Sequence, residues 1–301
     1  MSKPSIGFIG LGLMGSAMCQ RLLDLSYPLT IVANRSRGNV EKAVARGAVE
    51  VATAREVAER SDIIMLCMDT SASVESRMFG DDGVIAGLKP QAVAIDFGTS
   101  LPKSTRTIGE AVSASNAAYL DAPLGRTPAH ALNGELNIMC SGDRDAYDRV
   151  EPVLNDLGEN VFHLGALGSG HTIKLINNFF AMTTANAMAE AFAMADQMGV
   201  DREKLYAVMS AGPLHSGMMD FIKAYAVDGK PDALAFAVRN AKKDVGYYAQ
   251  MASNVNVDSI MSKSVREVLA AATDDGFGDR MIPEMVDYLS KKYSDSGSSQ
   301  S

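Results

Sequence analysis

SIGFIGLGLMG, residues 5 to 15, is the stretch that decides the fold. Its first five residues form an apolar run that predicts a short buried strand, and a helical pattern follows the last glycine. Between them, Gly10 permits a tight turn, Gly12 lets backbone N–H groups approach a pyrophosphate, and Gly15 lets the helix pack on the strand. A turn without a ligand is the alternative, but strand, glycines and helix in this order indicate a dinucleotide site. Its expected residues are Gly10, Gly12, Leu13, Met14 and Gly15.

The segment after the next apolar run indicates which dinucleotide binds. Leu29–Ala33 predicts the second strand, and Asn34-Arg35-Ser36-Arg37 follows it. An NAD enzyme usually places Asp or Glu near this point to hold the ribose hydroxyls. Arginine instead binds phosphate through two parallel hydrogen bonds, and serine adds a neutral donor. We therefore expect Asn34, Arg35 and Ser36 to favour NADP, with NAD still possible; two solvated surface arginines are the alternative.

Strand and helix patterns alternate as far as about Leu164. Uniformly apolar strands are typical of a parallel sheet that is covered on both faces. Further strands of this kind are expected at Ile63–Met68 and Ala92–Asp96, and three more segments are expected to extend the sheet: Ala118–Leu120, Leu136–Cys140 and Asn160–Phe162. We predict an α/β Rossmann domain with a doubly wound sheet in residues 1–164.

A second glycine-rich stretch changes the pattern. Gly165, Gly168 and Gly170 lead into a run without Gly or Pro that lasts until Gly199, which predicts a helix of roughly 29 residues, about 43 Å long. Ala and Met occur on all its sides, as in a buried helix, so we expect a second subunit to cover part of it in a homodimer or homotetramer. No strand pattern follows. The prediction is an all-α domain in residues 165–293 and a disordered tail in 294–301.

Three polar residues share one face near the start of this helix. Lys174 is followed by Asn177 and Asn178, three and four positions later. The positive end of a helix disfavours an ammonium group, so a partly buried lysine there gives up its proton more readily. Such a lysine can carry a proton at neutral pH.

Composition excludes several classes of protein. The chain has 301 residues and a net charge of −8, so we expect no nucleic-acid or membrane-surface partner. No uncharged apolar stretch is long enough to span a membrane, and strand-like sequence begins too early for a signal peptide. The three cysteines are interpreted as core residues in a reducing cytoplasm, and the four histidines lack metal-ligand spacing, so no metal is expected.

Five motifs in a fixed order, between Ile6 and about Tyr288, resemble the β-hydroxyacid dehydrogenase family. That family includes 3-hydroxyisobutyrate dehydrogenase, tartronate semialdehyde reductase, glyoxylate/succinic semialdehyde reductase and sulfolactaldehyde reductase. The motifs fall on Gly10, Gly12 and Gly15; on Gly98-Thr99 before Pro102; on Asp121 to Thr127; on Gly165, Gly168, Gly170, Lys174 and Asn178; and on Phe236 with Lys243-Asp244. The resemblance implies a Rossmann domain, a helical C-terminal domain whose long helix lies in a dimer interface, and no metal. It also implies that Met68, Thr99 and Lys243 contact the cofactor.

The substrate loop departs most from the family pattern. Where the family commonly has Ser-Gly-Gly, this chain has Gly125-Arg126-Thr127, which is similar to sulfolactaldehyde reductases. An arginine beside the reacting carbon offers a fork for a carboxylate or sulfonate; the alternative is an arginine turned to solvent. We expect Gly125, Arg126, Thr127, Asn177 and Asn178 to bind substrate. His130 and His215 are weaker candidates for the site.

The resemblance implies reversible hydride transfer between the nicotinamide and a small anionic aldehyde or its β-hydroxy acid. In this interpretation Lys174 carries the proton, Asn178 holds the reacting oxygen, and Lys243, oriented by Asp244, closes the cleft. An imine reductase of the same architecture and a non-catalytic NADP-binding module are the alternatives, and Lys174 argues against both. The sequence leaves open the substrate, carboxylate or sulfonate, and the physiological direction.

Overall fold

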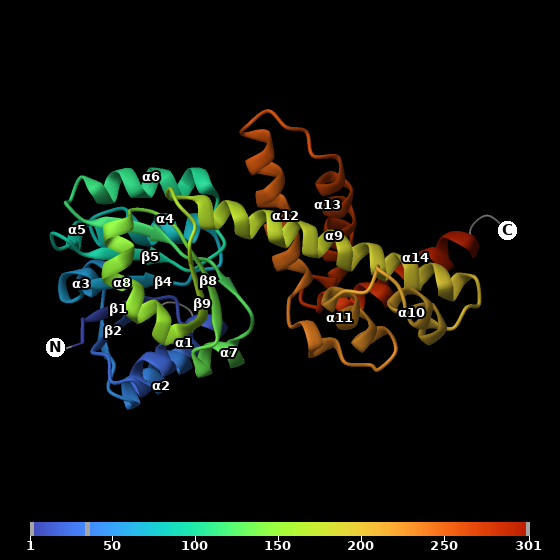
Figure 1. Ribbon diagram of the computed structural model, residues 1–301, viewed down its shortest axis with the longest axis horizontal. Helices are drawn as coiled ribbons and strands as arrows, with labels where there is room; N and C mark the ends of the chain where they lie inside the picture. Colours follow the sequence, from blue (N-terminus) through green and yellow to red (C-terminus); the bar gives the residue numbers. More distant parts are fainter. Residues whose placement is uncertain (1–2, 34–36, 299–301) are drawn as a thin grey trace. The chain divides into compact units, whose positions relative to one another are not determined.

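The computed structural model describes residues 3–33 and 37–298. The chain forms two compact units, Met1–Lys174 and Leu175–Ser301. The division falls within the longest helix, α9 (Ser169–Gln197), ten residues after the predicted domain boundary (Figure 1).

The first unit contains a six-stranded parallel sheet in the order β3-β2-β1-β4-β5-β6. The first strand lies in the middle and pairs on both sides, Ile6 with Leu29 and with Ile63. The chain therefore winds outward in both directions from β1, and the predicted doubly wound sheet is confirmed. The strands are β1 (Ile6–Ile9), β2 (Leu29–Val32), β3 (Val49–Val51), β4 (Ile63–Leu66), β5 (Val93–Asp96) and β6 (Ala118–Asp121).

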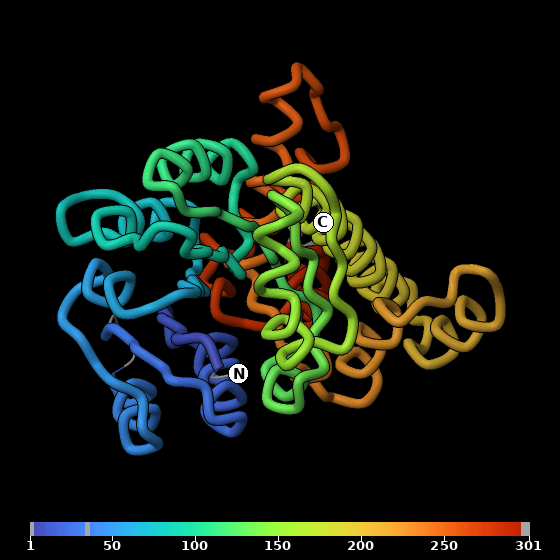
Figure 2. The backbone as a smooth tube through the Cα atoms, turned by 60° about the vertical axis from the view of Figure 1, so that its left-hand side comes forward, coloured from blue at the N-terminus to red at the C-terminus, as the bar shows by residue number. Residues whose placement is uncertain are grey.

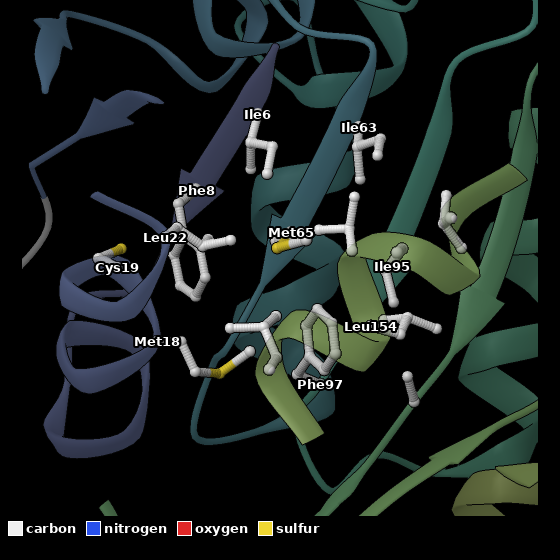
Figure 3. Close-up of a cluster of buried hydrophobic side chains, with 14 of the residues drawn as sticks. Ile6, Phe8, Met18, Cys19, Leu22, Ile63, Met65, Ile95, Phe97 and Leu154 are labelled. Atoms are coloured by element: carbon white, nitrogen blue, oxygen red, sulfur yellow. The ribbon is translucent and has the colours of Figure 1, made fainter. Parts of the chain in front are cut away.

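Helices cover both faces of this sheet. On one face Phe8, Met65 and Ile95 pack against helix side chains such as Met18 and Leu154, as Figure 3 shows. The other face has its own buried cluster, built from alternate residues of the same strands. Burial on both faces explains why these strands are apolar along their whole length. The helices are α1 (Leu13–Asp24), α2 (Arg37–Ala45), α3 (Ala54–Arg60), α4 (Ser71–Met78), α5 (Val84–Gly87) and α6 (Pro102–Ser113), together with α8 (Arg144–Leu157), which carries Leu154.

Two segments that were expected to extend the main sheet, Leu136–Cys140 and Asn160–Phe162, do not do so. Only β6 extends the main sheet; β7 (Leu124–Gly125), β8 (Leu136–Cys140) and β9 (Gly158–His163) form a separate three-stranded sheet, accompanied by α7 (Pro128–Asn133) and α8 (Arg144–Leu157). Burial alternates along β8, as in a sheet with one covered face, whereas β1 and β4 are buried throughout. The edge strand β3 was not predicted, because two of its three residues are not buried and its apolar signal is weak.

The second unit is built from helices around α9, which runs for the 29 residues predicted. Met188 and Phe192 of α9 pack in a core with Val245 of α12 (Val238–Ser253) and Leu269 of α13 (Ile260–Ala272). Helices α12 and α13 lie side by side in Figures 1 and 2. The remaining elements are α10 (Arg202–Ser210), α11 (Gly217–Ala226), η1 (Pro231–Leu234), α12 (Val238–Ser253), α13 (Ile260–Ala272), η2 (Thr273–Phe277), η3 (Ile282–Glu284) and α14 (Met285–Ser298).

Helix α14 extends into the segment for which disorder was predicted. It runs to Ser298, because Tyr293 packs against the helical core and Gln197 donates hydrogen bonds to the Ser290 carbonyl and the Ser294 hydroxyl. Residues 299–301 lie outside the described ones. Within the described ranges, no helix is both long and apolar enough to cross a membrane.

Candidate active site

The glycine turn between β1 and α1 has the geometry expected from its sequence. Gly10 has a φ of +100°, and a Cβ there would lie 2.4 Å from the Cys67 carbonyl oxygen. A Cβ on Gly15 would lie 1.9 Å from the Gly10 carbonyl oxygen. At Gly12, in contrast, no described atom lies within 4 Å of the Cβ position. Two glycines are therefore required for backbone packing, whereas Gly12 faces space that a ligand can occupy.

The first turn of α1 offers hydrogen-bond donors to such a ligand. Gly12 occupies the N-cap position without a side-chain cap, and no acidic residue lies in the first turn. Within residues 3–33 and 37–298, the N–H groups of Leu13 and Met14 have no hydrogen-bond acceptor. Free N–H groups and the positive end of a helix suit an anion. The residues present thus fit the pyrophosphate of a dinucleotide.

Two more loops meet this turn at the same edge of the sheet. Met68 follows β4, and its sulfur lies 2.8 Å from the Cβ position of Gly10, while its carbonyl oxygen lies 2.9 Å from that of Gly98, after β5. The close approach of the Met68 backbone leaves little room for a side chain at Gly98. Thr99 is the next residue along. The structure therefore brings Met68 and the Thr99 loop together with the glycine turn.

The residues expected to select the cofactor lie mostly outside the described ranges. Asn34, Arg35 and Ser36 belong to the stretch between residues 33 and 37, for which no structure is described. The neighbouring Arg37 donates hydrogen bonds to both carboxylate oxygens of Glu50 and one to Glu41. Its guanidinium is thus already bound to carboxylates.

The start of α9 differs from the start of α1, because protein atoms accept hydrogen bonds from its first N–H groups. Gly168 N–H and His171 N–H donate to the two oxygens of the Asp121 carboxylate, each over 2.7 Å. Gly170 N–H donates to the Ser141 hydroxyl over 2.9 Å, and Ser169 N–H to the Ala166 carbonyl over 3.0 Å. Each N–H group at this helix end therefore has an acceptor.

A second buried carboxylate lies beside Asp121. Asp96 ends β5 and pairs in register with Asp121, which ends β6. It accepts hydrogen bonds from Gly98 N–H (2.8 Å) and the Ser100 hydroxyl (2.7 Å). The buried His171 ring lies between the two carboxylates, 3.7 Å from Asp96 and 3.8 Å from Asp121. These contacts connect the Gly98–Ser100 loop to the first turn of α9.

Asp96, Asp121 and His171 form a buried polar cluster, and three further groups lie near it: Thr105, Tyr119 and Cys67. The Thr105 hydroxyl lies 2.7 Å from Nδ1 of His171. Burial, followed by the charges of Asp96 and Asp121, raises the pKa of the Tyr119 hydroxyl well above its ordinary value. Burial likewise raises the pKa of the Cys67 thiol to about 12, with Asp96 as the second cause. Both groups therefore stay neutral at physiological pH.

In the second unit, Asn178 belongs to a chain of polar contacts. Its side-chain N–H donates to Asp244 over 2.7 Å, and both residues are buried. Nζ of Lys243 lies 2.9 Å from the other oxygen of Asp244 and 5.2 Å from the Tyr247 ring centroid. Asn177, the neighbour of Asn178, is exposed. The contact of Lys243 with Asp244 agrees with the expected pairing.

Lys243 also lines a groove between α12 and α13. The groove has a volume of about 610 Å³, and four of its nine lining residues are basic: Lys242, Lys243, Lys263 and Arg266. Glu267 is its one acidic lining residue. In a chain of net charge −8, this local excess of positive charge favours anions.

The structure does not bring Arg126 to the start of α9. Its Nη1 donates to the Glu135 carbonyl oxygen (2.6 Å) and to the Glu159 carboxylate (2.5 Å). Glu135 precedes β8, whereas Gly170 lies against Met139 near the other end of that strand. Four residues of strand separate these points, about 13 Å at about 3.3 Å per residue. The Arg126 guanidinium is thus bound to Glu135 and Glu159, and its role in binding substrate stays a prediction.

The remaining residues of the substrate loop have local partners. The Thr127 hydroxyl lies 2.7 Å from Nδ1 of His130, and Gly125 ends β7 with its Cβ position 3.2 Å from Cβ of Asn137. His215 lies 2.9 Å from Asp220 in the second unit. These contacts leave the substrate roles of Gly125 and Thr127 as predictions.

The buried polar groups at the start of α9, Asp96, Asp121 and Ser141, could not be assigned a role from the sequence. The sequence pattern places Asp96 at the end of an expected strand and Asp121 in the substrate-loop motif, and it gives Ser141 no role. The available signal was that an aspartate ends two successive apolar strands, VAID and AYLD. Among the described residues, no group of three or more His, Cys, Asp or Glu side chains could hold a metal ion.

Comparison with known proteins covers both units. A family model described as the NAD binding domain of 6-phosphogluconate dehydrogenase matches residues 5–165. A second, described as the NAD-binding of NADP-dependent 3-hydroxyisobutyrate dehydrogenase, matches residues 168–289. Together they span nearly the whole chain.

Individual relatives agree with these models. The 3-sulfolactaldehyde reductase of Escherichia coli (strain K12) is 30% identical over 277 residues, which are 91% of this chain and 92% of that protein. A crystal structure of 3-hydroxyisobutyrate dehydrogenase from Salmonella typhimurium is 26% identical, with a TM-score of 0.82 over 95% of this chain and 100% of its own. An imine reductase from Myxococcus stipitatus in complex with NAD+ shares the fold, at 20% identity and a TM-score of 0.66 over 96% of this chain and 100% of its own.

Proposed function

Because the chain belongs to the β-hydroxyacid dehydrogenase family, we propose that it is an NADP(H)-dependent reductase of small anionic aldehydes. The same enzyme would oxidise the corresponding hydroxy acids. The substrate class comprises succinic and tartronic semialdehydes, the semialdehyde of 3-hydroxyisobutyrate, and 3-sulfolactaldehyde. The observation that carries the proposal is the pair Lys174 and Asn178, one helical turn apart on α9, with Asn178 held by the buried Asp244.

The cofactor's phosphates would bind at the N-terminus of α1. The N–H groups of Leu13 and Met14 would donate to the pyrophosphate, and Gly12 leaves it room. Met68 and Thr99 would line the same edge, and Lys243 would contact the nicotinamide side. When bound, the cofactor supplies the hydride; the protein supplies position and one proton.

Lys174 would donate that proton to the carbonyl oxygen during reduction and take it back during oxidation. Asn178 would hold the same oxygen. An amide nitrogen carries two N–H groups; one of them donates to Asp244, and we assign the other to the substrate. Thr127 and the backbone of Gly125 would help to hold the anionic group of the substrate, and Asn177 would lie at its margin.

The NADP preference rests on Arg35 and Ser36. A 2′-phosphate needs charge-assisted donors after the second strand. Arg37 contributes less in this proposal, because Glu50 and Glu41 already accept its hydrogen bonds.

An exposed apolar stripe along α9 supports a homodimer or homotetramer. Phe180 is 72% exposed, and Ile176 and Met194 are about half exposed; Met198, the first residue after the helix, is also 72% exposed. The helix is therefore not covered on all sides within one chain, and a second copy would bury this stripe. Sedimentation of wild type and of Phe180→Glu tests this: a wild-type monomer at micromolar concentration contradicts it.

The test of the proposed function is NADPH oxidation by purified protein with succinic, methylmalonic and tartronic semialdehydes, glyoxylate and sulfolactaldehyde. We expect turnover of at least one of them and a lower kcat/KM with NADH. A ketone together with an amine serves as the control for an imine reductase. NADPH binding without oxidation of NADPH by any aldehyde would indicate a binding module instead.

A further inference from the structure

The first turn of α9 is held by a carboxylate from a different part of the chain. Asp121 is fully buried at the end of β6. One of its oxygens accepts hydrogen bonds from Gly168 N–H and the Ser141 hydroxyl, and the other accepts one from His171 N–H. All three of these groups are donors. An ionised carboxylate suits them because it offers two acceptor oxygens and no donor.

Ser141 and Gly170 add further contacts between the first turn of α9 and the sheet. The Ser141 hydroxyl donates to Asp121 and accepts from Gly170 N–H. A Cβ on Gly170 would lie 2.2 Å from the Met139 carbonyl oxygen and 2.9 Å from the Asp121 carboxylate. The helix backbone therefore packs directly against β8, with no room for a side chain at Gly170.

The position of this first turn sets where Lys174 lies. Lys174 follows His171 by three residues, so the two lie on the same side of successive turns. Because a helix is stiff, any rotation or shift of the turn at Gly168–His171 moves Lys174 with it. An error of about 1 Å in the position of a reacting group can cost about 10²-fold in rate.

We propose that Asp121, supported by Ser141, is a positioning residue of the reduction: it holds the start of α9 so that Lys174 meets the carbonyl oxygen. This inference rests on the proposed function. It gives Asp121 no contact with substrate or cofactor, and it differs from the substrate-loop role implied by the family motif.

The principal variant is Asp121→Asn, which keeps the shape but replaces one acceptor oxygen by an N–H₂ donor facing N–H groups. We expect kcat to fall at least tenfold, while the KM for the aldehyde and the Kd for NADPH change less than threefold. We also expect a larger solvent deuterium isotope effect on kcat than in wild type, because proton transfer becomes slower.

Asp143→Asn is the matched control. Asp143 is the N-cap of α8 and accepts a hydrogen bond from Ala146 N–H over 2.8 Å, but α8 carries none of the proposed site residues. Its kcat should stay within a factor of two of wild type. If Asp143→Asn lowers kcat as much as Asp121→Asn does, the inference is overturned, because the same carboxylate-to-amide change at a helix start far along the chain from Lys174 would then have the same effect.

If Asp121→Asn does not fold, kcat is measured with Ser141→Ala instead. It removes one donor to Asp121 and the acceptor for Gly170 N–H, and we expect a three- to tenfold lower kcat with unchanged KM. Unchanged kcat in this folded variant overturns the inference. If wild type reduces aldehydes, Lys174→Ala does not, and both Asp121→Asn and Ser141→Ala keep full kcat, the inference fails while the proposed function stands. Failure of wild type on every aldehyde removes both.

Discussion

Two helices of this protein start in glycine-rich turns, and they differ in what accepts hydrogen bonds from their first N–H groups. At α1, the N–H groups of Leu13 and Met14 have no acceptor within the described residues, and a Cβ on Gly12 would meet no described atom within 4 Å. At α9, Asp121 and Ser141 accept from Gly168, Gly170 and His171. The same sequence signal therefore produces one helix end suited to a ligand and one closed by protein.

The difference concerns charge as well as hydrogen bonding. The positive end of a helix on its own favours an anion and disfavours an ammonium. At α9 a buried carboxylate already stands at that end, so the protein itself supplies the anion there. The reason for a glycine also differs between the two helix starts. Gly12 leaves room for a ligand, whereas Gly170 allows contact with the Met139 backbone.

The largest expected effect concerns the lysine beyond the closed helix end. Lys174→Ala should lower kcat by about 10²–10⁴-fold and leave the Kd for NADPH nearly unchanged, because the group carries a proton and does not bind the cofactor. Lys174→Arg should not restore activity, since a guanidinium does not give up its proton. Steady-state kinetics and a fluorescence titration of NADPH check both. More than a tenth of wild-type turnover in Lys174→Ala would remove the lysine from the mechanism.

The next effect concerns the open helix end. Gly12→Asp should raise the Kd for NADPH about 100-fold, about 2.7 kcal/mol, because a carboxylate would occupy the place of the pyrophosphate. The melting temperature should stay equal or rise slightly, since aspartate is a good N-cap and Gly12 has an ordinary φ of −70°. Ser216→Asp, at the N-cap of α11, is the control and should leave the Kd unchanged. Undiminished binding in Gly12→Asp would mean that the phosphates bind elsewhere.

A smaller effect is expected for the two arginines after β2, whose replacements should differ in how far they weaken NADPH binding. Arg35→Ala should weaken NADPH binding roughly 10-fold or more, the value of a lost charge-assisted hydrogen bond of about 1.5–3 kcal/mol, and should spare NADH. Arg37→Ala should change it less than threefold, because Glu50 and Glu41 already bind that side chain. Equal kcat/KM for NADH and NADPH in wild type would exclude the NADP preference.

The smallest effect is expected at Arg126. Its guanidinium is bound to Glu135 and Glu159, and its φ of +74° suits glycine. Arg126→Gly should therefore change KM less than threefold for anionic and neutral aldehydes alike, with little change in melting temperature. A tenfold higher KM for the anionic aldehyde alone would instead support the sequence-based interpretation, in which Arg126 binds the anionic group.

Features encoded by neighbouring residues were predictable from the sequence, whereas features that depend on distant partners were not. The glycine turn and the 29-residue α9 follow from local Gly and Pro placement, and the structure confirms the length of α9. Asp121 receives its role from Ser141, 20 residues away, and from the start of α9, 47 to 50 residues away.

Arg126 and β8 illustrate the same limit. The partner of Arg126, Glu159, lies 33 residues along the chain, and no local pattern pairs them. Burial alternates along β8, but four of its five residues are apolar, and the choice between joining the main sheet and forming a second one depends on which strand it pairs with.

Amide hydrogen exchange with and without NADPH tests most directly the contrast between the two helix starts. We predict that the amides of Leu13 and Met14 exchange rapidly in the free protein and become protected when NADPH binds. The amides of Gly168, Gly170 and His171 should be protected in both states, because Asp121 and Ser141 already accept their hydrogen bonds. The opposite pattern, with the α9 amides protected only by NADPH and the α1 amides unaffected, would contradict the account.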